Sequence, residues 1–152
     1  MIKYLFLYFM TLMMLFYAPV EKKINYVTYP KQYKLSATYY NNVKAQCDSS
    51  PHITANGTYL KGRNVNHLRY VAMSRDMIKT TQYHTKDMGY NPNAPFEFGD
   101  TIIVKNAGIF NGQWRVMDST NKRFKKRLDF LVSNRYIRFD SGREITVFKK
   151  EN

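Results

Sequence analysis

From Lys34 onward, short apolar runs alternate with clusters of turn-forming residues, and this pattern constrains the fold more than any other feature. The runs are shorter than ordinary helices and show no helical periodicity, whereas their length and composition are typical of β-strands. Six or seven such strands separated by long loops predict a mainly β fold, a small six-stranded β-barrel. The strands are expected at Leu35–Tyr40, Leu68–Met73, Thr101–Lys105, around Trp114, around Leu128 and at Arg143–Lys149, with one helical turn at Arg75–Ile78.

Residues 1–20 differ in composition from the rest of the chain. After a short basic start, Tyr4–Tyr17 is uncharged and rich in Leu, Phe and Met, which predicts a hydrophobic helix acting as a signal peptide or signal anchor. We expect a linker at residues 21–33 and one domain at residues 34–152. The protein is therefore predicted to be exported to the periplasm, cell envelope or exterior, with a membrane tether through residues 1–20 if cleavage fails. A buried N-terminal helix of a cytoplasmic protein is the alternative.

The formal net charge of +13 predicts a polyanionic neighbour: nucleic acid, an anionic membrane surface or a cell-wall polymer. Export would favour the membrane surface or the cell-wall polymer, so no nucleic acid is expected as a partner. A basic nucleic-acid-binding protein is therefore the weakest alternative. Cys47 is the only cysteine, so no internal disulfide can form. The three histidines are dispersed without metal-ligand spacing, and we expect neither a metal nor another cofactor.

Two aspartates eleven positions apart, Asp118 and Asp129, flank the one cluster of basic residues, Lys122–Arg127. Both follow or interrupt apolar strand residues, where partial desolvation would favour a protonated carboxyl group. Two such carboxyl groups at neighbouring strand ends suit acid–base chemistry. Hydrogen bonding to loop amides is the alternative, in which each aspartate stays ionised and caps its own loop.

Several short motifs follow one another along the chain. They are a T-A-N-G-T turn at Ile53–Thr58, an apolar strand ending in an acid at Arg69–Asp76, a G-D strand at Gly99–Val104, a V-x-D strand end at Val116–Thr120, and Leu128–Phe130 around the last aspartate. In this order and spacing the chain resembles the three-aspartate (3D) domain over roughly residues 35–149. This domain is a double-psi β-barrel found in membrane-bound lytic transglycosylase A, and its architecture is similar to that of rare-lipoprotein-A and expansin barrels.

The resemblance implies a double-psi β-barrel that acts on the glycan strands of peptidoglycan. It assigns the acid/base role of a lytic transglycosylase to Asp129, with Asp118 and Asp76 as supporting carboxylates. The loop after Asp118 departs from the family's Gly-Gly-rich loop, and the second domain that walls the glycan groove of transglycosylase A has no counterpart here. A non-catalytic cell-wall module that binds glycan is therefore the alternative function.

Sugar faces stack on aromatic rings, so Tyr40 and Trp114, together with Tyr39, are candidate substrate platforms. His52, in the loop after the first strand, is a further candidate because its side chain titrates near neutrality. Lys125 and Arg127 are candidate contacts to an anionic glycan, but cations close to Asp129 would favour its ionised form. The direction of these basic side chains thus decides whether Asp129 can act as an acid. The oligomeric state is left open.

Overall fold

The computed structural model describes residues 30–43, 50–62, 64–80, 89–133 and 139–150. Within these ranges the fold is mainly β, as predicted, and helical structure is limited to short 3₁₀ turns. The predicted N-terminal hydrophobic helix, most of the predicted linker and Cys47 lie outside the described residues. No helix in the described ranges is long and apolar enough to cross a membrane.

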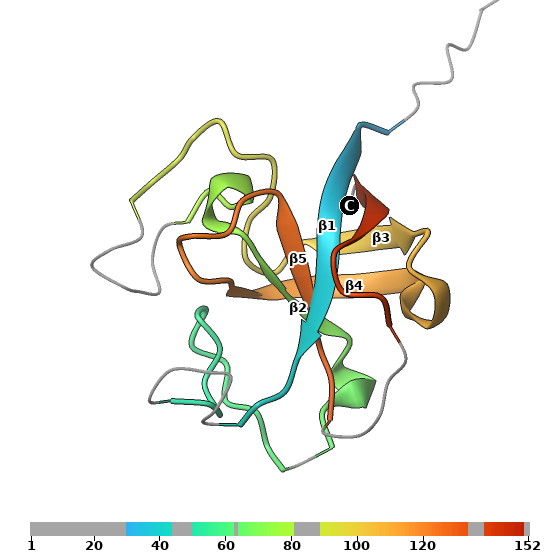
Figure 1. The fold of residues 1–152 in the computed structure, drawn as a ribbon. Helices are drawn as coiled ribbons and strands as arrows, with labels where there is room; N and C mark the ends of the chain where they lie inside the picture. The colour runs from blue at the N-terminus through green and yellow to red at the C-terminus, as the bar shows by residue number, and fades with distance from the viewer. Residues whose placement is uncertain (1–29, 44–49, 63, 81–88, 134–138, 151–152) are drawn as a thin grey trace, which may run out of the picture.

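Six strands form one closed ring in which each strand pairs with two others, in the order β1-β5-β2-β4-β3-β6 (Figure 1). In Figure 1, β3 and β4 run across the direction of β1. The strands are β1 (Gln32–Tyr40), β2 (Tyr70–Met73), β3 (Thr101–Lys105), β4 (Gly112–Ser119), β5 (Arg127–Leu131) and β6 (Arg143–Lys149), and the 3₁₀ turns are η1 (Asn66–Leu68), η2 (Arg75–Met77) and η3 (Gly108–Phe110).

The ring has an internal symmetry of connection. β1 pairs with β5 and β2 with β4 in parallel, whereas β1·β6, β3·β4, β2·β5 and β3·β6 are antiparallel. If β1 is exchanged with β4, β2 with β5 and β3 with β6, every parallel pair becomes a parallel pair and every antiparallel pair becomes an antiparallel pair. The two halves of the domain, β1–β3 and β4–β6, therefore have the same topology and interlock, because every strand pair joins one half to the other.

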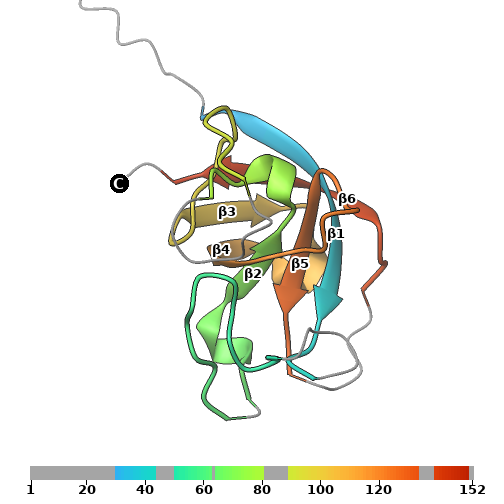
Figure 2. The same cartoon turned by 90° about the vertical axis from the view of Figure 1, so that its left-hand side faces the viewer.

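The core lies inside the ring. Leu35, Val71, Ile102, Phe130 and Ile145 come from five different strands and are at most 1% exposed. Burying apolar side chains of this size is the main stabilising contribution in a domain of this length. A second, smaller cluster of Leu60, Val65 and Leu131 packs the segments 50–62 and 64–68 against β5, near the end of β1 and the start of β2 (Figure 2).

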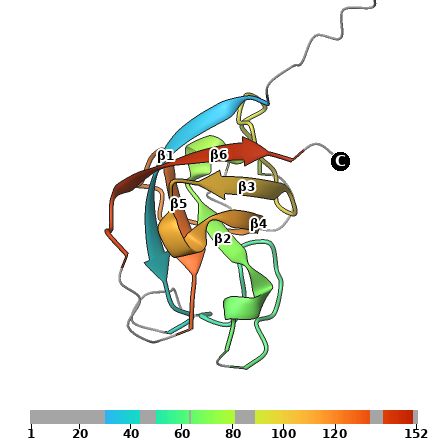
Figure 3. The same ribbon diagram turned by 90° about the vertical axis from the view of Figure 1, so that its right-hand side faces the viewer.

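Two strand boundaries differ from the prediction. β1 begins at Gln32 instead of Leu35, because Gln32 and Tyr33 pair with β6, which runs beside β1 in Figure 3. β2 begins at Tyr70 instead of Leu68, because η1 ends in Arg69 at φ 52°, a left-handed conformation that a strand cannot contain. The predicted helical turn after β2 is confirmed as η2.

Candidate functional site

A row of paired residues crosses four strands on one face of the sheet. Thr38 of β1 pairs with Asp129 of β5, Asp129 pairs with Ala72 of β2, and Ala72 pairs with Asp118 of β4. Directly paired residues on neighbouring strands direct their side chains to the same face. This face is the outer one, because Leu128 and Phe130, on either side of Asp129, lie in the core. Asp118 and Asp129 thus share a face, separated by one alanine.

A β-bulge decides which residue of β4 joins this row. The register between β2 and β4 shifts after the pair Val71–Val116, so that Ala72 pairs with Asp118 and Met117 is the extra residue. Without this bulge, Met117 would stand opposite Ala72 and Asp118 would follow one step later. The bulge therefore aligns the two carboxylates.

Asp129 is held by two strong donors that both bond to its Oδ1 atom. Thr38 Oγ1 donates at 2.7 Å, and Arg127 Nε donates at 2.7 Å in an ion pair. Arg127 Nη2 also donates to Thr38 Oγ1 at 2.7 Å, which closes a three-membered network. The Asp129 side chain is only 13% exposed. Both donors bond to the same oxygen, while no donor to Oδ2 is found among the described residues.

Among its described contacts, Asp118 accepts hydrogen bonds from two distant parts of the chain and from the neighbouring residue. Tyr40 Oη donates to Oδ2 at 2.9 Å, and the backbone amides of Ala55 and Ser119 donate to Oδ1 at 2.9 and 2.8 Å. Three donors stabilise the charged carboxylate. Asp118 therefore anchors the turn of residues 54–58 to the end of β4, which is the loop-capping alternative considered from the sequence.

Asp76 caps the loop that leads into β5. Its two carboxylate oxygens accept the backbone amide of Lys126 at 3.1 and 3.4 Å. Lys126 has φ 46°, a conformation that is costly for a residue with a side chain. The Asp76 carboxylate thus holds a strained turn, and among the described contacts it touches neither Asp118 nor Asp129.

The three aspartates therefore do not form one cluster. Asp118 and Asp129 share a row but have separate partners, and Asp76 belongs to the loop beyond β2.

The basic loop places Arg127 at the site and leaves Lys125 exposed to solvent. The Arg127 guanidinium lies 3.9 Å from the centre of the Phe124 ring, a cation–π contact that fixes its plane. Arg127 thus points toward Asp129, the direction that opposes a protonated acid. An open hollow of about 460 Å³ lies beside this ion pair, lined by Ser36, Thr38, Tyr39, Arg127, Ser141 and Gly142.

Trp114 is not a sugar platform. The residue is 3% exposed, its Nε1 donates to the Phe110 carbonyl at 2.7 Å, and its ring packs against Phe110 and Phe130. The Arg69 guanidinium covers the indole at 3.8 Å, and desolvation by burial lowers the pKa of Arg69. The prediction of a stacking surface at Trp114 is therefore corrected: alternation in β4 turns this ring into the core.

The remaining predicted contacts divide between the site and the surface. Tyr40 bonds to Asp118, as described above, and Tyr39 is half-buried at the hollow. His52 is exposed in the short hairpin where Ile53 pairs with Tyr59, and it touches none of the aspartates in the described contacts. Thr38 was missed, although the alternation of Leu35 and Ala37 with Ser36 and Thr38 indicates that Thr38 shares the face of Tyr40.

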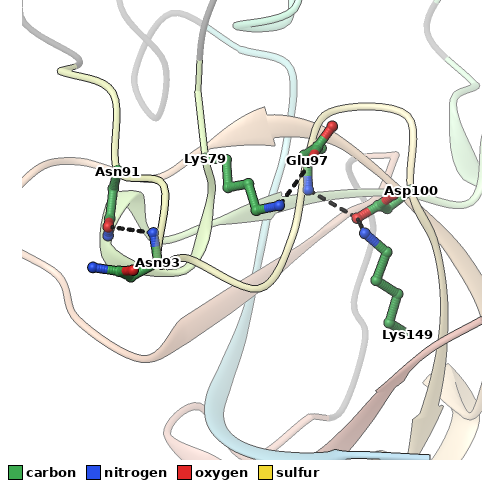
Figure 4. A network of polar contacts seen from close by, with 6 residues as sticks. All are labelled: Lys79, Asn91, Asn93, Glu97, Asp100 and Lys149. Carbon is green, nitrogen blue, oxygen red and sulfur yellow. Dashed lines mark hydrogen bonds and ion pairs between the residues drawn. The ribbon is translucent and has the colours of Figure 1, made fainter.

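A second carboxylate network surrounds Asp100 of the G-D motif and shares no described side-chain contact with the Asp129 row (Figure 4). Asp100 Oδ2 accepts the Glu97 amide at 2.8 Å and pairs with Lys149 Nζ at 2.7 Å. Glu97 in turn pairs with Lys79 at 3.1 Å. Asp100 closes the turn through Gly99, at φ 93°, that leads into β3.

No group of His, Cys, Asp and Glu suited to holding a metal ion occurs in the described part of the chain. No protein-family model matches this chain, and no curated protein or solved structure matches it either. The resemblance to the three-aspartate domain therefore stays a prediction that rests on the sequence motifs.

Proposed function

We propose that this protein is an exported double-psi β-barrel that acts on the glycan strands of peptidoglycan, with Asp129 as the acid/base of a lytic-transglycosylase-type cleavage. The order of the sequence motifs supports the assignment. Two interlocking halves, each contributing one strand to each of the two parallel pairs, are consistent with a double-psi barrel.

One observation carries the catalytic part of the proposal. Asp129 lies on the outer face of β5, and both of its described hydrogen bonds go to Oδ1. Its second oxygen, Oδ2, is the atom that would exchange a proton with substrate. Thr38 and Arg127, the partners of Asp129, line the polar hollow next to it, so a bound glycan would lie close to the carboxyl group.

The chemistry needs only one such group. Protonated Asp129 gives its proton to the glycosidic oxygen as the C1–O4 bond breaks, and its carboxylate then takes the proton of the sugar's C6 hydroxyl as O6 bonds to C1. The proton balance closes on a single residue, in contrast to the two carboxylates of most glycoside hydrolases. Because Arg127 is ion-paired with Asp129 at 2.7 Å, substrate binding has to draw the guanidinium of Arg127 away before the first step.

The test is incubation of the purified protein with sacculi, followed by analysis of the released fragments. We expect anhydro-muropeptides from the native protein and none from Asp129→Asn. Asp100→Asn is the matched control, since it makes the same chemical change in the other ion-paired aspartate of the described residues and should leave the yield unchanged. No anhydro product from the native protein, or an equal yield from Asp129→Asn, would remove the catalytic role.

The Arg127–Asp129 ion pair itself favours a second candidate, a non-catalytic module that binds glycan strands. In that case sacculi retain the protein without cleavage, and Asp129→Asn binds as well as the native protein. Charge reversal at Lys125 and Lys126, which are exposed, should weaken retention most at low salt, because surface charge attraction is screened by ions. If sacculi retained the protein equally well after charge reversal and at high salt, this alternative would be contradicted.

A further inference from the structure

The hollow beside the Asp129 row has a lining that suits an anion. Three of its residues carry aliphatic hydroxyl groups, one is a tyrosine and one is Arg127, while none is acidic. Neither Ser36 Oγ nor Ser141 Oγ has a hydrogen-bond partner among the described residues. The hollow thus combines neutral donors with one guanidinium.

Arg127 has more donors than its known contacts use. A guanidinium carries five N–H groups in a rigid fork, and the described contacts employ Nε toward Asp129 and Nη2 toward Thr38. Stacking on Phe124 at 3.9 Å holds the plane of the fork in place. The remaining N–H groups belong to a side chain that lines the hollow and is 24% exposed, so they are preorganised for a ligand.

We propose that this hollow binds the carboxylate group of a ligand. Arg127 already engages one carboxylate along its Nε edge, and the planar fork matches a second one geometrically. Asp129, two residues from Arg127, already holds its Nε edge, while the other acidic side chains near the lining residues in sequence lie elsewhere: Glu144 is paired with Lys34 at 2.9 Å, and Asp140 does not line the hollow. The net charge of +13 favours the approach of an anion.

A bound carboxylate would compete with Asp129 for the guanidinium. Occupation of the hollow would thus draw the guanidinium away from the Asp129 Oδ1 atom. This consequence rests on the proposed function, because it supplies the displacement of Arg127 that the cleavage requires. The binding site itself does not depend on glycan cleavage.

The binding test is an NMR titration of the ¹⁵N-labelled protein with acetate, with acetamide as a neutral probe of the same shape. We expect saturable shifts for the amides of Thr38, Tyr39 and Gly142 with acetate and none with acetamide. Inorganic phosphate forms the third arm. Equal responses to acetate and acetamide, no saturable response to acetate, or tighter binding of phosphate than of acetate would each overturn the assignment to a carboxylate.

Arg127→Gln should weaken acetate binding about tenfold or more, as loss of a charged hydrogen-bond donor implies. Arg115→Gln is the control, since Arg115 is an exposed arginine of β4 outside the hollow and should bind acetate like the native protein. Ser141→Asp provides an independent test that keeps Arg127: a carboxylate attached at the hollow should suppress the acetate response. Native-like binding by Arg127→Gln or by Ser141→Asp would overturn the site, whatever the sacculus experiment gives.

Discussion

Asp129 and Asp100 form two carboxylate networks that look alike atom by atom but differ in the origin of their partners. Each aspartate receives a cationic nitrogen at 2.7 Å and a second donor at 2.7 or 2.8 Å on the same oxygen. The second donor of Asp100 is the amide of Glu97, three residues away, whereas that of Asp129 is Thr38, which is 91 residues away. Asp100 closes its own turn, and Asp129 joins two strands that meet only in the folded ring.

The cations differ as well. Lys149 is 39% exposed, while Arg127 is 24% exposed and bonds at once to Asp129 and Thr38. Solvent and salt screen the first pair more than the second. The amide bond to Asp100 is local and stabilises a turn, whereas the Thr38 bond to Asp129 is long-range and joins two strands. This difference makes Asp129 the better candidate for chemistry, and four substitutions test it.

Asp129→Ala is expected to have the largest effect. It removes the acceptor for Arg127 and Thr38 in a partly buried place, so the free energy of unfolding should fall by about 2–4 kcal/mol. Urea unfolding measures this value, and Asp129→Asn should lose less because it keeps the shape and an acceptor oxygen. A loss no greater than that of Asp100→Ala would erase the contrast between the networks.

Arg127→Gln should rank second, with a loss of about 1–3 kcal/mol, because the Asp129 carboxylate keeps its bond from Thr38. Combining it with Asp129→Asn should cost less than the sum of the two single changes, since both remove the same ion pair. A double-mutant cycle from urea unfolding gives this coupling. Strictly additive losses would show that the pair contributes no coupling energy.

Asp100→Ala should cost about 1 kcal/mol, which is typical for losing a carboxylate that accepts a nearby turn amide. The same unfolding experiment measures it, and Asp100→Asn should recover much of the loss because its amide oxygen still accepts the Glu97 amide. If Asp100→Asn were as unstable as Asp100→Ala, the ion pair with Lys149 would outweigh the turn bond.

Lys149→Gln is expected to have the smallest effect, about 0.5 kcal/mol at low salt and less at high salt, as for other exposed ion pairs. Thermal unfolding at two salt concentrations is sufficient to measure it. A larger, salt-independent loss would mean that the Asp100 pair behaves like a buried one and that exposure does not separate the two networks.

Much of the fold follows from local patterns. Each expected strand is present, and the mainly β class is correct, because alternation and turn residues act within a few neighbours. The predicted start of β2 was wrong because Arg69 has a left-handed backbone conformation, which its residue type does not indicate. Trp114 was wrongly predicted as a surface platform because the sequence does not show which face of the strand is buried. An aromatic residue in a strand can lie in the core or on the surface, and Trp114 lies in the core.

The sequence by itself indicated the strands that carry the two aspartates but left the direction of the basic side chains open. It predicted both aspartates at strand ends, which is correct for Asp118 in β4, whereas Asp129 lies in the middle of β5. Only the tertiary structure decided their partners. Thr38 meets Asp129 through parallel pairing of β1 with β5, and Asp118 stands opposite Ala72 through a single bulge. Register between strands distant in the chain depends on how the whole ring closes, and a shift of one residue would turn each side chain to the other face.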